Sequence, residues 1–447
     1  MNLLTIAWKS IRQRALASSL TGLSVALGVM LMVAVLVTYS VVQESFAQKS
    51  IGYDLVLGRR GSDLQLVLST VYRVGDPPPN VPYTYYLKLK NRELEYPREM
   101  RFVEAAVPIA MGDVTKEGAF PIIGTTGEYF THEYVPGREF GIRGDIFRQP
   151  FDAIIGHRVA RENRWNLGSQ FTLVHGGAEG HDHDEKFTVV GVLAPTGTAN
   201  DRTVFIHLNG FYAIAGHDTP PHEAYQREAE FYGREVDQAE FDRLQRQWER
   251  EQSQSGHHHH RMEDWQKQLS AIFITVRNRP SAYLLLGTLR KGSGNVMAVN
   301  PVDPMRDLMT NVVGNVATAM LVLTGLVVVV SGISIFVSIY NSMSERRREI
   351  AIMRALGAQR RTVFSIILAE SVLLCFGGGL LGVVLGHGIV FFAAPFVEIR
   401  TGLIINPLTF HPWEAVLLPA LVVLASLVGF LPGLSAYRTD VARTLAE

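Results

Sequence analysis

The sequence has a single cysteine, no surplus of either charge and no nucleotide-binding motif. Cys375 has no second cysteine to pair with, so a disulfide within the chain is excluded. Lys and Arg total 42, as do Asp and Glu, so the basic surplus that favours nucleic-acid binding is missing. The nearest approach to a phosphate-binding Gly-x4-Gly-Lys-Ser/Thr loop, at 287–292, lacks the lysine. We therefore expect that this chain is not an enzyme and that ATP is hydrolysed on another polypeptide.

Charged residues are also missing from four long stretches of the chain, namely 15–43, 308–344, 371–397 and 415–437. A helix needs about 20 predominantly apolar residues to cross the hydrocarbon core of a bilayer. The predicted transmembrane spans are 15–43, 308–344, 363–397 and 414–437. The first span follows Lys9, Arg12 and Arg14, as in a signal peptide, but its apolar run is longer than the core of a cleaved signal. We interpret it as a retained membrane anchor.

The distribution of basic residues predicts the orientation of these spans, because Lys and Arg accumulate on the cytoplasmic side of membrane proteins. Residues 1–14 contain three basic residues and no acidic one. The loop at 345–362 contains six arginines against two glutamates, and the tail at 438–447 contains two arginines. Both termini and this loop are therefore expected in the cytoplasm, and 44–307 and 398–413 are expected outside it.

The segment at 44–307 has the pattern of a mixed α/β domain. Short apolar, β-branched runs broken by Gly and Pro are typical of strands, and they occur at 53–57, 119–124, 171–174 and 187–193. The predicted fold is therefore an α-helical membrane protein with four transmembrane helices and a mixed α/β extracytoplasmic domain between the first and second spans.

Two segments of this domain differ from the short strands. Residues 152–167 have the apolar spacing of a short helix that ends near Gly168. Residues 217–268 are rich in Glu, Gln and Arg, which indicates a solvated insertion that is either helical near 237–251 or a mobile loop. Residues 271–276 again predict a strand.

The loop at 345–362 is the most informative polar segment. Its apolar residues, among them Ile350 and Met353, and the terminating Gly357 fit a short amphipathic helix with an arginine-rich face. Such a helix is suited to docking its apolar side into a groove of another protein, with its guanidinium groups on surface carboxylates. The alternative is an ordinary basic loop at the membrane surface.

Several segments resemble one known protein family, the MacB/FtsX-like ABC transporter permeases of type VII, which include lipoprotein-releasing permeases. The loop segment 344–358 is similar to the signature of that family. Segments 368–382 and 7–12 resemble its third span and its amphipathic N-terminal helix, here 1–14. Residues 153–156 and 187–202 resemble its periplasmic domain. The resemblance does not extend to the insertion at 217–268.

The resemblance implies that the loop is a coupling helix that contacts an ATPase. The residues it implicates are Glu345, Arg346, Arg347, Arg348, Glu349, Arg354, Leu356 and Gly357. It also implies a bacterial inner-membrane location, a cytosolic ABC ATPase dimer that binds ATP and Mg²⁺, and a second permease copy, as a homodimer or a related heterodimer. A periplasmic adaptor, a lipoprotein or an envelope enzyme is the partner expected outside the membrane.

Three glycines recur at every fourth residue of the third span, namely Gly378, Gly382 and Gly386. This spacing lets two helices approach closely, either in static packing or at an interface that shifts during a transport cycle. Glu370, near the start of the span, is costly in lipid unless it snorkels or pairs with an arginine, and a proton relay is a third alternative. Other polar residues in the spans are few, which favours transmission of motion over a polar conduit.

Ten of the fourteen histidines lie between residues 175 and 260. The candidate metal ligands among them are His175, His181, His183, His257, His258, His259 and His260. Imidazole and carboxylate groups together suit Zn²⁺ and related ions. The alternatives are a solvated loop, a segment that responds to pH, and adventitious metal binding.

Three functions stay open on this basis. In the first, a permease relays ATP-driven motion to its outer domain for export, lipoprotein extraction or metal-linked transport. In the second, a non-transporting regulatory protein controls an envelope enzyme. In the third, the chain is a membrane-anchored metal sensor. Apart from zinc, no cofactor on this chain is expected, nor is a nucleic-acid partner.

Overall fold

The computed structural model divides the chain into two compact units. The helical unit comprises Met1–Ala47 and Leu308–Glu447, and the sheet unit comprises Gln48–Asp307. The described residues are 3–46, 52–94, 96–175, 185–214, 217, 219–254, 262–291, 295–345, 347–401, 408 and 410–438. The predicted fold class is confirmed, because a mixed sheet lies in the chain between the first and second long apolar helices.

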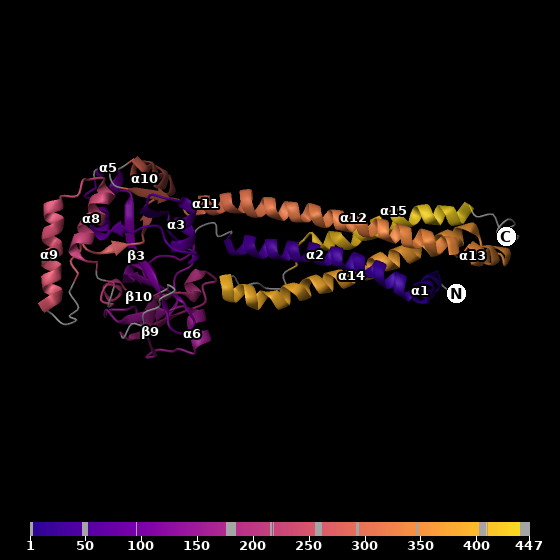
Figure 1. Cartoon of the computed structure of the whole chain (residues 1–447), viewed down its shortest axis with the longest axis horizontal. Coiled ribbons are helices and arrows are strands. Elements are labelled where there is room, and N and C mark those ends of the chain that lie inside the picture. Colours follow the sequence, from indigo (N-terminus) through magenta and orange to yellow (C-terminus); the bar gives the residue numbers. More distant parts are fainter. Residues whose placement is uncertain are drawn as a thin grey trace. The chain divides into compact units, whose positions relative to one another are not determined.

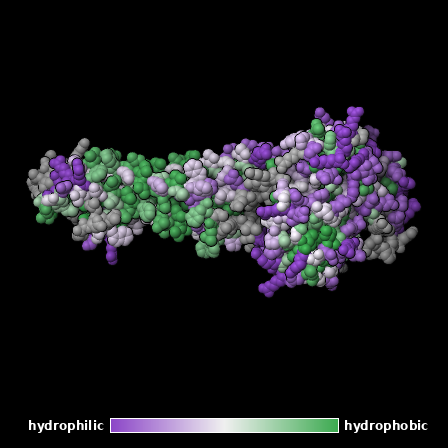
Figure 2. All heavy atoms as spheres, turned by 180° about the vertical axis from the view of Figure 1, so that it is seen from behind, coloured by the Kyte–Doolittle hydropathy of each residue, from purple (hydrophilic) through white to green (hydrophobic). Residues whose placement is uncertain are grey.

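The helical unit is built on four long helices (Figure 1). They are α2 (Ala15–Phe46), α12 (Gly314–Glu345), α14 (Arg360–Thr401) and α15 (Glu414–Arg438). Each is long and apolar enough to cross a membrane. Large apolar side chains also face outward, since Val322, Leu326 and Val330 of α12 are 58–60% exposed. Figure 2 shows this hydrophobic surface along the helical unit, as expected for helices that face lipid.

A row of valines fills the interior of the helical unit. Val25, Val29, Val33 and Val37 recur at every fourth residue of α2 and are 0–3% exposed, which places them on one face of the helix. α2 packs against α14 and α12, and α14 also packs against α15. The unit is completed by α1 (Leu3–Gln13), η3 (Leu308–Val313) and α13 (Arg347–Ala355). The long helices are therefore held by specific side-chain packing as well as by their apolar content.

The centre of the sheet unit is a mixed sheet that has eleven strands within the described residues. Its main path runs through β13 (Val296–Val299), β1 (Leu55–Arg59), β12 (Ala271–Val276), β3 (Val103–Thr115), β4 (Pro121–Thr125), β10 (Val204–His207), β6 (Asp152–Ile155), β9 (Phe187–Leu193) and β5 (Ile142–Gly144). Beside this path, β7 (Gln170–Phe171) pairs with β9, and β8 (Leu173–His175) pairs with β3. The pairs β4–β10 and β6–β9 are parallel. The long strand β3 joins the two parts of the sheet, because it pairs with β12 over its first half and with β4 and β8 over its second.

Aromatic and β-branched side chains from these strands form the core of the sheet unit. Phe187, Phe205 and Phe273 are at most 2% exposed. The remaining elements are α3 (Asp63–Thr70), β2 (Val81–Pro82), α4 (Tyr83–Lys90), α5 (Pro97–Met100), η1 (Gly127–Thr131), α6 (His157–Asn163), η2 (Ala199–Arg202), α7 (Leu208–Phe211), α8 (Pro221–Tyr232), α9 (Gln238–Gln254), β11 (Gln268–Leu269), α10 (Arg279–Lys291) and α11 (Val302–Asp307).

The structure corrects one local prediction and confirms another. The helix expected over 152–167 is wrong in its first part, which forms strand β6, and only His157–Asn163 is helical as α6. The apolar run 153–155 is central to the sheet, between β10 and β9, where strand pairing overrides helical spacing. The helix expected near 237–251 is confirmed as α9, and the same insertion also contains α8.

Candidate functional site

Helix α13, between the second and third spans, ends in a tight turn at Gly357. This glycine has a φ of +101°, in the left-handed region that L side chains rarely adopt. Its amide donates to the carbonyl of Arg354 at 3.1 Å, and the amide of Ala358 donates to the carbonyl of Met353 at 3.0 Å. These bonds satisfy carbonyl groups at the end of the helix. Gly357 therefore determines where α13 stops.

The apolar side of α13 packs inside the helical unit. Ile350 is 3% exposed, Ala351 is fully buried, and Met353 packs against the same cluster. The expectation that this side docks into a partner protein is wrong, because the chain's own helices cover it. Leu356, at the end of the segment, is 83% exposed. Ile352 of α13 is also 45% exposed, so another protein can reach both of these apolar side chains.

The charged residues implicated in coupling gather at α13. Those within the helix are Arg347, Arg348, Glu349 and Arg354. Glu345 ends α12, whereas Arg346 lies outside the described residues. Arg360 opens α14, and its guanidinium carbon lies 5.8 Å from the centre of the Tyr437 ring. Along the chain, arginines therefore lie before and after the buried apolar residues Ile350 and Ala351.

The glycine repeat of α14 lies against α2. A Cβ atom on Gly378 would lie 2.7 Å from the carbonyl oxygen of Gly22, and one on Gly382 would lie 2.6 Å from that of Ala26. One on Gly386 would lie 2.7 Å from the Cβ of Val33 on α2. Cβ atoms essentially never make contacts this short. The closest approach of the first and third spans therefore depends on these three glycines.

Glu370 is buried within the helical unit. It is 8% exposed, and the hydroxyl of Ser10 on α1 donates a hydrogen bond to its Oε2 at 2.9 Å. Glu370 is therefore held inside the helical unit by a contact with α1. A second polar contact joins the hydroxyls of Ser24 on α2 and Ser331 on α12 at 3.0 Å. These two contacts tie α1 to α14 and α2 to α12.

The histidine candidates are placed only in part. His175 is the last residue of strand β8. The others, His181, His183, His257, His258, His259 and His260, lie outside the described residues. Across the parts of the chain that are described, no group of three or more His, Cys, Asp or Glu residues could hold a metal ion. Zinc binding by the two histidine-rich segments therefore stays a prediction.

Sequence reasoning missed two polar arrangements in the sheet unit. Asp201 of η2 accepts hydrogen bonds from the amide and hydroxyl of Thr196 and from the amide of Gly197, at 2.7–2.8 Å. His217 contacts Asp113 of β3 at 2.9 Å. The run of Thr, Gly, Asn and Asp at 196–201 is a turn signal that indicates the first. No local pattern indicates the second, because its two residues lie far apart in the chain.

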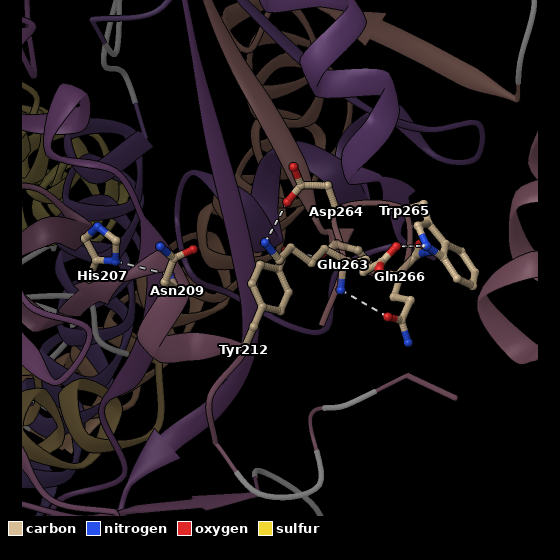
Figure 3. Close-up of polar contacts among 9 residues, drawn as sticks. His207, Asn209, Tyr212, Glu263, Asp264, Trp265 and Gln266 are labelled. Atoms are coloured by element: carbon tan, nitrogen blue, oxygen red, sulfur yellow. Dashed lines mark hydrogen bonds and ion pairs between the residues drawn. The ribbon is translucent and has the colours of Figure 1, made fainter. Parts of the chain in front are cut away.

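A polar turn closes the insertion and supports α7. In Figure 3, the indole nitrogen of Trp265 donates to Glu263 at 2.8 Å, and the amide of Glu263 donates to the side chain of Gln266 at 3.0 Å. The hydroxyl of Tyr212, just after α7, donates to the carbonyl of Gln268 at 2.6 Å. Burial raises the pKa of the Tyr212 phenol well above its ordinary value, so the phenol keeps the proton that it donates. The end of α7 is therefore fixed against β11.

These features define a multi-pass membrane protein that carries one mixed-sheet domain between its first and second spans. Two protein-family models match the chain. The MacB-like periplasmic core domain matches residues 18–249, just over half of the chain, and the FtsX-like permease C-terminal domain matches residues 321–441. The first match includes 217–249, so the expectation that the insertion lies wholly outside the family resemblance is wrong. The chain belongs to the MacB/FtsX-type family of ABC transporter permeases.

Curated relatives match shorter segments. A macrolide export ATP-binding/permease protein MacB from Rhodopirellula baltica is 34% identical over 89 residues, which are 20% of this chain and 13% of that protein. The protein of the same name from Chromobacterium violaceum is 33% identical over 127 residues, 27% of this chain and 18% of that protein. An uncharacterized ABC transporter permease YknZ from Bacillus subtilis is 37% identical over 81 residues, 18% of this chain and 19% of that protein. The matched segments thus span less than a fifth of the length of these relatives.

Proposed function

We propose that this chain is a permease subunit that receives the force of ATP hydrolysis from a separate cytosolic ATPase dimer and transmits it to its sheet unit. The observation that carries the proposal is the construction of α13. Its apolar side is anchored in the transmembrane helices through Ile350, and its end presents Leu356 to solvent. When a partner displaces a helix that is anchored in this way, the transmembrane helices move with it. Rigid elements transmit motion in the same manner in other switching transitions.

The orientation follows from the same proposal. The ATPase and its Mg²⁺ and ATP lie in the cytoplasm, so α13 and both termini lie there, and the sheet unit lies outside, as the arginine distribution supports. ABC ATPases act as dimers, so the assembly contains two permease copies, identical or related. The arginines around α13 would pair with carboxylates on the ATPase surface.

The work of the sheet unit is proposed to be the movement of a substrate outside the cytoplasm. The scarcity of polar residues within the spans supports this, because a hydrophilic conduit needs polar groups to replace water. Crosslinking in living cells, followed by identification of the proteins captured by the sheet unit, tests it. An outer-membrane channel or adaptor supports export, and a lipoprotein supports extraction. Capture of a cell-wall hydrolase instead supports the regulatory alternative.

Reversing two charges on α13 is expected to weaken binding of the ATPase. We expect Arg347→Glu with Arg348→Glu to lower co-purification of the ATPase at least tenfold, because each attraction to a carboxylate becomes a repulsion. The protein should still insert, since neither residue lies in a span. Quantitative pull-down from solubilised membranes measures the effect. Arg161→Glu with Arg164→Glu, on exposed positions of the sheet unit, is the matched control and should leave binding unchanged.

If the α13 double variant retains the ATPase at the wild-type level, α13 is not the contact. A Leu356→Asp variant adds an independent reading, because it alters the exposed apolar residue without touching an arginine. It should also reduce ATPase binding while leaving the amount of protein in the membrane unchanged.

A further inference from the structure

A cleft in the sheet unit belongs to neither the coupling segment nor the helix-packing glycines. Its volume of about 660 Å³ lies within the range of roughly 300–1,000 Å³ that is typical of small-molecule sites. Three segments enclose it, namely β5, the end of β9, and α6 with the turn that follows it. α6 and β9 lie side by side (Figure 1). The cleft is therefore built by elements of one compact unit.

Three arginines line this cleft, and the described part of the chain places no carboxylate among its lining residues. Arg143 belongs to β5, Arg161 to α6, and Arg164 caps the end of α6. Arg161 and Arg164 are three residues apart, a spacing that places two side chains on one face of a helix. The acidic residue between them, Glu162, forms an ion pair with Arg158, which does not line the cleft. The lining therefore carries a concentration of positive charge.

The described residues do not compensate this positive charge. Nη2 of Arg143 donates to the side-chain oxygen of Asn166 at 3.3 Å, and this neutral acceptor orients the arginine without neutralising it. Arg161 and Arg164 are exposed, and neither forms an ion pair within the described ranges. Like charges that gather at one cleft repel each other. An anion that binds between the guanidinium groups would remove this repulsion.

The backbone of Arg164 is in a conformation that suits glycine better. Its φ is +56°, in the left-handed region, where it ends α6. Glycine is the usual residue at such a helix end because it has no Cβ atom to clash. Strained residues of this kind are found where the side chain has a role of its own. Since Arg164 also lines the cleft, its guanidinium group is the part with that role.

An apolar surface lies beside the arginines. The indole of Trp165 is stacked on Phe171, with ring centroids 4.9 Å apart and an interplanar angle of 18°, and Trp165 also lines the cleft. Ile142 and Val192 add aliphatic side chains to the lining. Sites for organic ligands combine an apolar lining with a few polar groups in this way. The cleft therefore suits a ligand that has both an anionic and an apolar part.

We propose that this cleft binds an organic phosphate that carries an apolar group. Near neutral pH a phosphate monoester has about two negative charges and three strong acceptor oxygens, enough for several guanidinium groups. Arginine recognises phosphate through two parallel N–H donors. The apolar group lies against Trp165. Binding requires neither an ATPase nor α13, so this proposal stands or falls apart from the proposed function.

Calorimetric titration of the full-length protein tests this proposal. The protein is reconstituted in phosphatidylcholine nanodiscs in a phosphate-free buffer and titrated with 1-naphthyl phosphate, and the heat from empty nanodiscs is subtracted. The wild type should show one saturable site per chain. 1-Naphthol lacks the charge and inorganic phosphate lacks the ring, so each should bind about tenfold more weakly or worse.

Arg164→Gly separates binding from folding. The change removes the guanidinium group and relieves the left-handed strain, so the melting temperature should stay the same or rise while affinity for 1-naphthyl phosphate falls about tenfold or more. Arg161→Gln should weaken binding to a similar extent, and it carries the test if Arg164→Gly fails to fold. Arg92→Gly is the matched control, because Arg92 is exposed, has a φ of +61° and does not line the cleft. Its affinity should equal that of the wild type.

Several results would overturn the site. They are no saturable binding by the wild type, wild-type affinity in either folded cleft variant, an equal loss of affinity in Arg92→Gly, or binding of 1-naphthol or inorganic phosphate as tight as that of the ester. Competition then distinguishes the two sources of such a phosphate. Stronger displacement by dihexanoyl phosphatidic acid than by hexyl phosphate would support the site and indicate a lipid headgroup, and equal or weaker displacement would support it and indicate a soluble ester. If neither compound displaces 1-naphthyl phosphate, the proposal is wrong.

Discussion

Replacing Gly382 by leucine is expected to abolish the accumulation of folded protein in the membrane. A Cβ atom at this position would lie 2.6 Å from the carbonyl oxygen of Ala26 and 2.7 Å from the Cβ of Val29. The first of these neighbours is backbone, so no rotamer change relieves the clash, and α14 must move away from α2. Overpacking of a core costs about 1–3 kcal/mol when side chains can adjust. We expect a larger cost here because a whole helix interface must open.

The chain contains its own control for this substitution. Gly377 lies in the same helix, and nothing lies within 4 Å of a Cβ atom built on it. Gly377→Leu should therefore accumulate and melt as the wild type does. Size-exclusion chromatography in detergent, with thermal unfolding of the monodisperse fraction, measures both variants. Equal behaviour of the two leucine variants would show that the contact between α2 and α14 does not depend on the glycine repeat.

The smaller Gly382→Ala change addresses whether this interface moves. If α2 and α14 only pack against each other, the alanine variant should lose no more ATPase activity than its loss of stability explains. Alanine adds the same Cβ atom, so it should lower the melting temperature of the permease. If α2 and α14 slide during the cycle, it should lower ATPase turnover in the assembled complex by more than this loss of stability accounts for. Gly377→Ala is again the control and should alter neither quantity.

The parts of the fold that local physics determines could be predicted from the sequence. The four long helices were predicted because a bilayer requires about 20 apolar residues in one stretch, whatever the rest of the chain does. Strands β9 and β12 were predicted with the bounds that the structure has, because their apolar runs are short, β-branched and bounded by turns.

Contacts between distant segments could not be predicted in this way. Residues 153–155 fit a helix by spacing, and only their position between two neighbouring strands makes them a strand. The apolar side of α13 was correctly seen as apolar, but the sequence does not say whether a partner or the chain itself covers Ile350. The meeting of Asp113 and His217 depends on where the chain returns after α7, which no local pattern encodes.

Asp201→Ala is expected to destabilise the sheet unit by about 3–5 kcal/mol. The carboxylate is buried and accepts three hydrogen bonds, from the amide and hydroxyl of Thr196 and from the amide of Gly197. Hydrogen bonds to a charged group contribute about 1.5–3 kcal/mol each, and donors left buried without an acceptor add a penalty. These terms are not additive within one network, which keeps the expected total below their sum.

The carbonyl oxygen of Asp201 also lies where a side chain on Gly156 would be, 2.3 Å from a Cβ atom built on that glycine. The turn at 196–202 therefore packs closely on the junction between β6 and α6, and its loss should loosen both. Hydrogen exchange of the amides of Thr196 and Gly197, followed by mass spectrometry on the full-length protein, measures the change locally. Asp145→Ala, at a side chain that is 79% exposed, should leave exchange unchanged. If these amides stay protected in Asp201→Ala, Asp201 does not hold the turn in place. The similarity of this turn to the family's periplasmic domain then has a cause other than structural support.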